Sequence, residues 1–408
     1  MGAASATKPA AKDPPKIREQ DLTHMHYFDR LAPLLERLRD VGCERDRPKN
    51  RTLHFDQYCM LILLYLFNPV VKSLRGLQQA SELPKVQKRL GCSRTSLGSL
   101  SESTTVFDPE RLKEIIAELG TQLTPVGRDA RLKDIAQVVT LVDGTVLSVL
   151  PHLAKASFGG NTDGKVRWHL HTHFEVDRYV PRRIDVTPSG GGENDERSVL
   201  ERTVEPDRLY VMDRGYAKFA LFNRIVGAKS SYVCRVRDNS VYEVVEQRPI
   251  SAEAAAERVT SDSVVSLGSN TAHPLDHKVR LITIAAKPHN KCTKAPGPDC
   301  DGTIRIATNL LDVPAEVIAL LYHYRWTIEI FFRFFKQILG CRHLLSTSRN
   351  GIEIQVYCAI IACLLINLWT GRKPTLRTHE MICWYFLGIA ELEDLLAHLE
   401  KLKKRDSH

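Results

Sequence analysis

The chain lacks a long, uninterrupted hydrophobic run of the kind that marks a membrane-spanning helix. The longest uncharged apolar stretch, residues 354–370, contains Gln355 and Asn367 and is marginal for a bilayer, so we expect a buried helix there. Residues 1–16 also lack the apolar segment of a secretion signal, and their Ala, Pro and Lys content predicts a disordered lead. We therefore expect an intracellular, cytoplasmic protein with no membrane partner.

A disulfide framework is absent as well. The 10 cysteines show no regular spacing. Several lie inside apolar helical runs, as buried reduced thiols do, namely Cys59, Cys358, Cys363 and Cys383. This usage favours a reducing compartment. Cys292 and Cys300, with His289 nearby, would need a fourth ligand and tighter spacing to bind zinc, so we predict a plain surface loop.

Internal repeats at a solenoid period are also missing, so the size of the chain implies separate domains. Its 408 residues, 43% of them hydrophobic, are enough for two or three domains with a sizeable core. The formal charge of +9, from 57 Lys and Arg against 48 Asp and Glu, suits an anionic partner. Nucleic acid fits this excess better than a membrane surface.

The N-terminal part, residues 17–125, has a helical pattern. Short helices are predicted at 73–80, 85–90 and 93–102, with turns between them. Such an arrangement presents basic side chains and hydroxyls to a phosphate backbone, and the basic residues are Lys85, Lys88, Arg89 and Arg94. The segment is therefore a candidate DNA-binding region, although a helical bundle with a solvated basic face explains it nearly as well.

Beyond residue 125 the pattern changes to an α/β arrangement with a mixed sheet. The expected elements are a buried strand at 135–141, a hairpin over 165–186, a helix at 195–204, a strand at 209–212 and a helix at 217–226. We assign residues 126–230 and 311–350 to this core. Residues 231–310 alternate in the manner of strands and are predicted to form an inserted β subdomain, and residues 351–408 are predicted to be helical.

Two acidic residues stand where predicted strands end. Asp143 follows the first strand, in Asp143-Gly144-Thr145, and Asp213 follows the strand at 209–212. Each of these, taken alone, is also a common turn. Because a twisted mixed sheet brings the ends of adjacent strands together, we expect the two carboxylates to converge.

A third acid, Glu329, lies on a helix that is predicted to begin after Pro314. At about 100° per residue, five polar or charged side chains share one narrow stripe of this helix. They are Tyr322, Arg325, Glu329, Arg333 and Lys336. The stripe is either a face of ion pairs, since Arg325 and Glu329 are four residues apart, or a metal-binding carboxylate flanked by phosphate-binding cations. Together the three carboxylates would form a hard-oxygen site that suits Mg²⁺ or Mn²⁺.

The order of these motifs resembles a known family. Asp-Gly-Thr at 143–145, Asp-Arg-Gly-Tyr at 213–216 and Tyr-x2-Arg-x3-Glu-x6-Lys at 322–336 are similar to motifs of the DDE transposases of the bacterial insertion-sequence family called IS-four. The likeness runs over residues 135–340 and is looser in the helical N-terminal region. It implies a ribonuclease-H-like catalytic core with a β insertion. It also implies a cut-and-paste enzyme that binds insertion-sequence ends, cleaves them and joins their 3′ ends to target DNA.

The resemblance also implies roles for individual residues. Asp143, Asp213 and Glu329 would be the catalytic residues and would bind two divalent ions, Mg²⁺ or Mn²⁺. Other side chains would contact DNA instead of pairing with Glu329, and these are Tyr322, Arg325 and Lys336, with Trp326, Arg214 and Tyr216 as further candidates. For Trp326, base stacking is one interpretation, and packing in the core is the one that we favour. The partners would be double-stranded terminal repeats and target DNA, bound by a dimer on paired ends in the bacterial cytoplasm and nucleoid.

Two other activities remain open at this point. The same core could serve a metal-dependent nuclease that does not join strands, or a decayed, DNA-binding repressor of transposition. The complete acid set argues against decay, since a non-catalytic protein has no physical need for a cluster of like charges. The chain has no Trp between Trp168 and Trp326, which puts a hairpin intermediate in doubt.

Three histidines alternate on a predicted strand, His169, His171 and His173. They would face one side of the sheet, where a transition-metal site is one interpretation. Polar lining or plain packing is the interpretation that we favour, because the proposed oxygen-ligand chemistry does not require them.

Overall fold

The computed structural model describes residues 31–39, 41, 51–123, 125, 129–148, 167–268, 274–285, 302–338, 344–346 and 348–406. Two predictions lie outside these residues. One is the disordered lead at 1–16, and the other is the loop with His289, Cys292 and Cys300.

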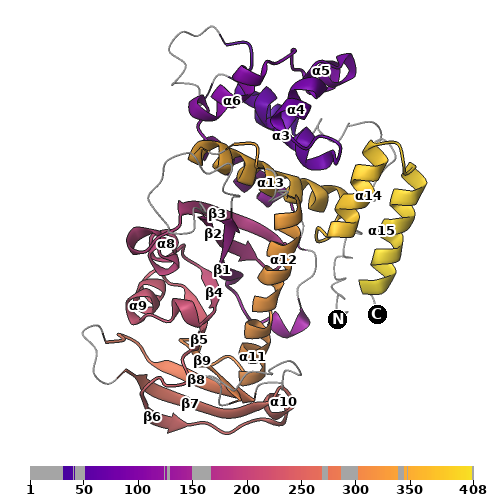
Figure 1. The fold of residues 1–408 in the computed structure, drawn as a ribbon. Coiled ribbons are helices and arrows are strands. Elements are labelled where there is room, and N and C mark those ends of the chain that lie inside the picture. The colour runs from indigo at the N-terminus through magenta and orange to yellow at the C-terminus, as the bar shows by residue number, and fades with distance from the viewer. Residues whose placement is uncertain are drawn as a thin grey trace, which may run out of the picture.

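Nine strands of the described chain form one mixed sheet, in the order β3-β2-β1-β4-β5-β9-β8-β7-β6 (Figure 1). They are β1 (Val138–Ser148), β2 (Arg167–Glu175), β3 (Val180–Pro188), β4 (Arg208–Met212), β5 (Ser231–Val236), β6 (Tyr242–Gln247), β7 (Val259–Leu267), β8 (Val279–Ala285) and β9 (Thr303–Thr308). The central strand β1 is antiparallel to β2 and parallel to β4, and β4 is parallel to β5. The mixed sheet of an α/β fold that the sequence predicts is confirmed.

The two faces of β1 and β4 contact different helices. Figure 1 shows α8 (Glu196–Thr203) and α9 (Phe219–Gly227) on one side of the sheet and α12 (Arg325–Ile338) on the other. Within β4, Val211 packs into the core on the α12 side, whereas Met212 packs with α8 and α9. Burial on both faces explains why these strands have near-continuous apolar sequences rather than alternating ones.

The β insertion continues the core sheet instead of forming a separate sheet. β5 pairs in parallel with β4, with Tyr232 opposite Tyr210, so the predicted boundary at residue 231 cuts through hydrogen-bonded strands. β9 then pairs antiparallel with β5, and β8, β7 and β6 follow outward. The prediction of strands in this segment is correct, and these strands extend the core sheet outward from β5. Pairing between distant segments decides this boundary, and local sequence does not encode it.

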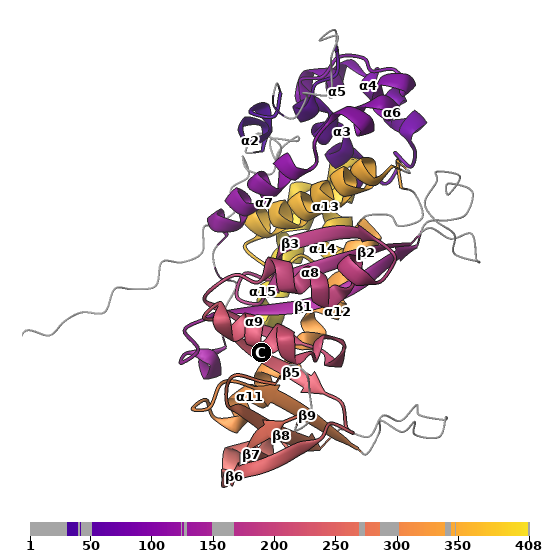
Figure 2. The ribbon, with the colours of Figure 1, turned by 90° about the vertical axis from the view of Figure 1, so that its left-hand side faces the viewer.

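Helices from both ends of the chain pack together at one end of the sheet. The N-terminal helices are α2 (Ala32–Glu36), α3 (Phe55–Phe67), α4 (Leu74–Ser81), α5 (Pro84–Leu90), α6 (Leu97–Val106) and α7 (Glu110–Gln122). The C-terminal helices are α13 (Arg349–Thr370), α14 (Leu376–Phe386) and α15 (Leu392–Asp406). Two further helices, α10 (Ala252–Ala256) and α11 (Ala315–His323), pack against β7 instead. Figure 2 shows α13 alongside α7 and next to β3. The predicted N- and C-terminal helical regions therefore share one core.

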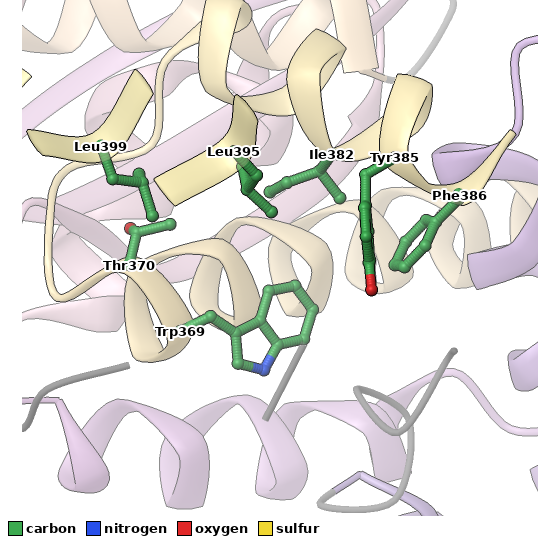
Figure 3. A pocket seen from close by; sticks show the side chains of 7 residues that line it. All are labelled: Trp369, Thr370, Ile382, Tyr385, Phe386, Leu395 and Leu399. Carbon is green, nitrogen blue, oxygen red and sulfur yellow. The ribbon is translucent and has the colours of Figure 1, made fainter. Parts of the chain in front are cut away.

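The helix α13 is the described helix that is long and apolar enough to cross a membrane by length and composition. Inside the protein, 94% of its most apolar window is buried, so the predicted buried helix is confirmed. Its C-terminal end packs against α14 and α15. A small apolar pocket there is lined by Trp369, Thr370, Ile382, Tyr385, Phe386, Leu395 and Leu399 (Figure 3).

Candidate active site

Asp143 lies inside a strand rather than after its end. β1 continues to Ser148, and Asp143 is paired there with Thr172 of β2. On its other side, β1 pairs with β4 only as far as Val142 and Met212. Asp143 therefore stands one residue beyond the end of its parallel neighbour. The predicted strand end is wrong for β1 and holds only for the pairing with β4.

Asp213 directly follows β4, as the sequence predicts. It begins the short 3₁₀ helix η5 (Arg214–Tyr216), and its Oδ1 atom accepts a hydrogen bond from the Gly215 N–H at 2.8 Å. Because β1 and β4 are paired in register up to the preceding residue of each strand, Asp143 and Asp213 are neighbours. The expected convergence of these two carboxylates is present in the structure.

The environment of Asp143 disfavours its charged form. Burial, followed by the charges of Asp213 and Glu196, raises the pKa of Asp143 to about 7. The Gly144 N–H, which donates to Asp143 Oδ1 at 2.8 Å, and the Arg325 guanidinium act in the opposite direction. The pKa is raised because these two contacts do not offset burial and neighbouring like charges. Additional positive charge at this position would favour the carboxylate.

Glu329 is carried by α12, which packs against β1. Its Oε1 atom lies 2.7 Å from Nη1 of Arg325, so these two side chains form an ion pair. Arg325 therefore makes the ion pair that the alternative interpretation of the stripe predicts, and its contact with DNA stays a prediction. Because Arg325 also lowers the pKa of Asp143, its guanidinium acts on both carboxylates.

The donor set fits a hard divalent cation, although the side chains are not gathered around one. In the described part of the chain, no three Asp, Glu, His or Cys side chains are close enough to hold a metal ion as they stand. Asp143 and Asp213 each direct Oδ1 to a backbone N–H, and Glu329 is paired with Arg325. Carboxylate oxygens are nevertheless the ligands that Mg²⁺ and Mn²⁺ prefer. To act as a third ligand, Glu329 has to exchange Arg325 for the cation.

The other residues of the stripe on α11 and α12 differ in exposure. Tyr322 is half-buried, and the Arg325 guanidinium lies 5.9 Å from its ring centroid. Trp326 is 56% exposed, and its ring centroid lies 5.3 Å from the same guanidinium, so the favoured prediction of core packing is wrong for this residue. Lys336 is half-buried in the last turn of α12, and Arg333 is exposed.

The two residues next to Asp213 point to different environments. Arg214 is exposed, in agreement with a surface role. Tyr216 is only 1% exposed, and its hydroxyl has no hydrogen-bond partner among the described residues. Burial, followed by the charges of Glu196, Asp143 and Asp213, raises its pKa well above the ordinary value. The structure therefore does not support direct DNA contact by Tyr216.

The alternating histidines of β2 take part in local hydrogen bonds. His171 Nε2 is 2.8 Å from Thr187 Oγ1, and His173 Nε2 is 3.1 Å from Thr203 Oγ1. Burial lowers the pKa of both rings to about 4, which keeps them neutral near pH 7. These contacts fit the packing interpretation rather than a transition-metal site.

Sequence reasoning missed Glu196. It is the first residue of α8 and lies against β1, because a Cβ atom built on Gly144 would be only 2.2 Å from Glu196 Oε1. Burial, followed by the charge of Asp213, raises its pKa. The sequence does hold one signal that could have identified Glu196. This residue lies in the first helical turn after the glycine-rich loop at 189–192, beside the N-cap residue Asp195.

Comparisons with known proteins point to transposases. The family model described as "Transposase DDE domain" matches residues 135–365. A putative transposase, y4zB, of Sinorhizobium fredii is 30% identical over 233 residues, which cover 57% of this chain and 60% of that protein. A probable transposase for insertion sequence element IS5377 of Geobacillus stearothermophilus is 28% identical over 230 residues, which cover 56% of this chain and 55% of that protein. The match thus spans less than two thirds of either relative.

A solved structure was also similar in part. The piggyBac transposase synaptic complex with hairpin DNA aligns with 96% of this chain and 86% of its own, at 11% identity and a TM-score of 0.41. That likeness is too weak to support an argument. The family model, in contrast, covers more than half of the chain and includes Asp143, Asp213 and Glu329. The chain therefore belongs to the transposase DDE domain family.

Proposed function

We propose that this protein is a DNA transposase that binds insertion-sequence ends, cleaves them by metal-dependent phosphodiester hydrolysis and joins their 3′ ends to target DNA. One observation carries the proposal. Asp143 and Asp213 are neighbours where β4 ends, and the helix that carries Glu329 packs against the same strand as Asp143. Membership of the transposase DDE domain family supports the same reaction.

The three carboxylates would hold the divalent ions, which we propose to be two Mg²⁺ or Mn²⁺. When bound, such ions stabilise the charge of an in-line displacement and activate a water or a 3′-hydroxyl. The part of the protein is to hold the carboxylates at fixed positions. Asp143 is fixed by strand pairing on β2, and Asp213 is fixed by its hydrogen bond to Gly215.

We propose that Arg325 pairs with Glu329 when DNA is absent and with a DNA phosphate when DNA is bound. In the structure it neutralises Glu329 across 2.7 Å, which compensates a carboxylate in the absence of a cation. A DNA phosphate offers the guanidinium an alternative anion with suitable geometry. If Arg325 moves to phosphate, Glu329 is released to the cation. Tyr322 and Lys336 would bind neighbouring phosphates, because a hydroxyl donates to phosphate oxygen and an ammonium neutralises it.

We further propose that the protein binds double-stranded terminal repeats and target DNA as a dimer on paired ends, in the bacterial cytoplasm and at the nucleoid. Lys85 and Lys88 are exposed on α5, which supports a role of the N-terminal helices in DNA binding. Arg94 is also exposed, but it pairs with Glu82 at 3.2 Å. The basic excess of the chain favours the same partner.

The proposal is tested with the full chain, a labelled duplex of the insertion-sequence end and a target plasmid. In Mg²⁺, the wild type is expected to nick the duplex and join it to the plasmid, and EDTA is expected to stop both steps. Glu329→Gln should abolish nicking, whereas Glu243→Gln, which changes an exposed carboxylate on β6, should not.

Three results would contradict the proposal in different ways. Nicking without joining would identify a nuclease. Specific binding of the end duplex without nicking in Mg²⁺ or Mn²⁺ would identify a repressor. Undiminished nicking by Glu329→Gln would show that this carboxylate has no role in the chemistry.

A further inference from the structure

We propose that Glu196 is a fourth acidic residue of the active site and holds the divalent cation together with Asp143 and Asp213. The inference rests on the proposed metal-dependent function. It adds a residue from α8 to a site otherwise built from two strand positions and α12.

The first observation is the contact between α8 and β1. A Cβ atom at position 144 would lie 2.2 Å from Glu196 Oε1 and 2.8 Å from its carboxyl carbon. Only glycine leaves this space, so Gly144, the residue that follows Asp143, allows the Glu196 carboxylate to lie against β1. The Gly144 N–H donates to Asp143, so one glycine contacts one carboxylate and makes room for the other.

The second observation is that Glu196 has no partner that explains its position. The neighbouring Arg197 donates to Asp195 Oδ1 through Nε at 2.8 Å and to Oδ2 through Nη2 at 3.0 Å, so it is occupied by the N-cap residue. In the described parts of the chain, no hydrogen bond or ion pair to the Glu196 carboxylate is present. A half-buried carboxylate without a hydrogen bond or an ion pair is unfavourable.

The third observation is independent of the acids and points to a ligand. The Tyr216 hydroxyl is buried, with the residue 1% exposed, and among the described residues nothing accepts or donates a hydrogen bond to it. Leaving a buried hydroxyl unpaired costs about 1–3 kcal/mol. After burial, the charges that most affect this hydroxyl are Glu196, Asp143 and Asp213. A buried donor at the acidic cluster is suited to a cation-bound water or to a carboxylate that turns when a cation binds.

The charge balance supports the same conclusion. Asp143, Asp213, Glu196 and Glu329 carry four negative charges when ionised, and two divalent ions supply the matching positive charge. Like charges held close together repel one another. Bound cations would remove this repulsion and would also release Arg325 from Glu329.

The alternative role of Glu196 is purely structural. An acidic residue in the first turn of a helix interacts favourably with the helix dipole, by about 0.3–1 kcal/mol. That role predicts a small loss of stability on substitution and no change in metal affinity. Metal binding therefore separates the two roles.

The test measures binding of Mn²⁺ to the full chain by electron paramagnetic resonance, without DNA. Glu196→Gln is expected to weaken Mn²⁺ binding at least about tenfold. Asp213→Asn should do the same, and Glu193→Gln, an exposed acid of the same loop, should bind as the wild type does. Circular dichroism verifies that each variant is folded.

Gly144→Ala provides a second variant that retains the Glu196 carboxylate but displaces it. It is also expected to weaken Mn²⁺ binding about tenfold. Wild-type affinity in both Glu196→Gln and Gly144→Ala, with a loss in Asp213→Asn, would overturn the role of Glu196 while leaving the proposed function intact. A wild type that does not bind Mn²⁺ at all would overturn both.

Discussion

A buried ion pair ties the β insertion to the segment that precedes α11, and its removal should strongly destabilise the protein. Asp262 on β7 and Arg280 on β8 are 3% and 4% exposed. Nε and Nη2 of Arg280 donate to the two Asp262 oxygens at 2.8 and 2.7 Å. Nη1 donates to the backbone carbonyls of Leu311, at 3.2 Å, and Val313, which precede α11.

The predicted magnitude follows from this burial. Arg280→Met leaves the Asp262 charge buried without compensation, so the free energy of unfolding should fall by about 3–5 kcal/mol. The double variant Asp262→Leu/Arg280→Met removes the stranded charge and should recover most of the loss. A deficit of about 1–3 kcal/mol should remain, because the Val313 carbonyl still lacks its donor.

The assay is urea unfolding followed by far-ultraviolet circular dichroism. Arg131→Met is the matched control, because Arg131 makes a similar two-pronged pair with Asp129 but is 56% exposed. It should lose no more than about 1 kcal/mol. A loss of less than about 1 kcal/mol in Arg280→Met, or a double variant as unstable as the single one, would refute the reasoning.

Three further predictions concern the site and the sheet. Trp326→Ala should cost less than about 1 kcal/mol of stability, because this side chain is exposed. Phe331→Ala should cost about 3–5 kcal/mol, because Phe331 is only 1% exposed. Equal losses of stability in thermal unfolding would contradict this difference. Burial lowers the pKa of His173 from 6.5 to about 4, so between these pH values only the unfolded chain takes up a proton at this residue. The free energy of unfolding should therefore fall by up to about 3 kcal/mol as the pH drops from about 6.5 to about 4. His173→Gln should flatten the pH dependence of the urea midpoint, and an unchanged dependence would exclude His173 as its origin. Arg325→Gln should weaken binding of the insertion-sequence end. It should also reduce the slope of the logarithm of the binding constant against the logarithm of the salt concentration by about one. An unchanged slope would show that Arg325 stays paired with Glu329 when DNA binds.

The sequence was sufficient to predict those acidic site residues that are marked by their neighbours in the chain. Asp213 could be predicted because an apolar strand and an Asp-Arg-Gly turn adjoin it in sequence. Glu329 could be predicted because helical spacing is a local property. The apolar sequence of β1 likewise predicts a strand buried on both faces.

Features that depend on distant pairing could not be predicted in the same way. The extent of β1 beyond Asp143 is set by pairing with β2, and the end of its pairing with β4 is set by Met212. The continuity of the sheet depends on β9, which returns to pair with β5 from far along the chain. Glu196 was missed for the same reason, since its closeness to Gly144 arises only when α8 packs onto β1.

The central claim is that Asp213, with Asp143 and Glu329, holds a divalent metal during DNA cleavage. Asp213→Cys tests it most directly, because a thiolate is a softer ligand than a carboxylate and favours Mn²⁺ over Mg²⁺. We predict that Asp213→Cys loses nicking of the insertion-sequence end in Mg²⁺ and recovers it in part in Mn²⁺, while Asp213→Ala remains inactive in both metals. Wild-type nicking by Asp213→Cys in Mg²⁺, or no recovery in Mn²⁺ by the folded variant, would contradict the account.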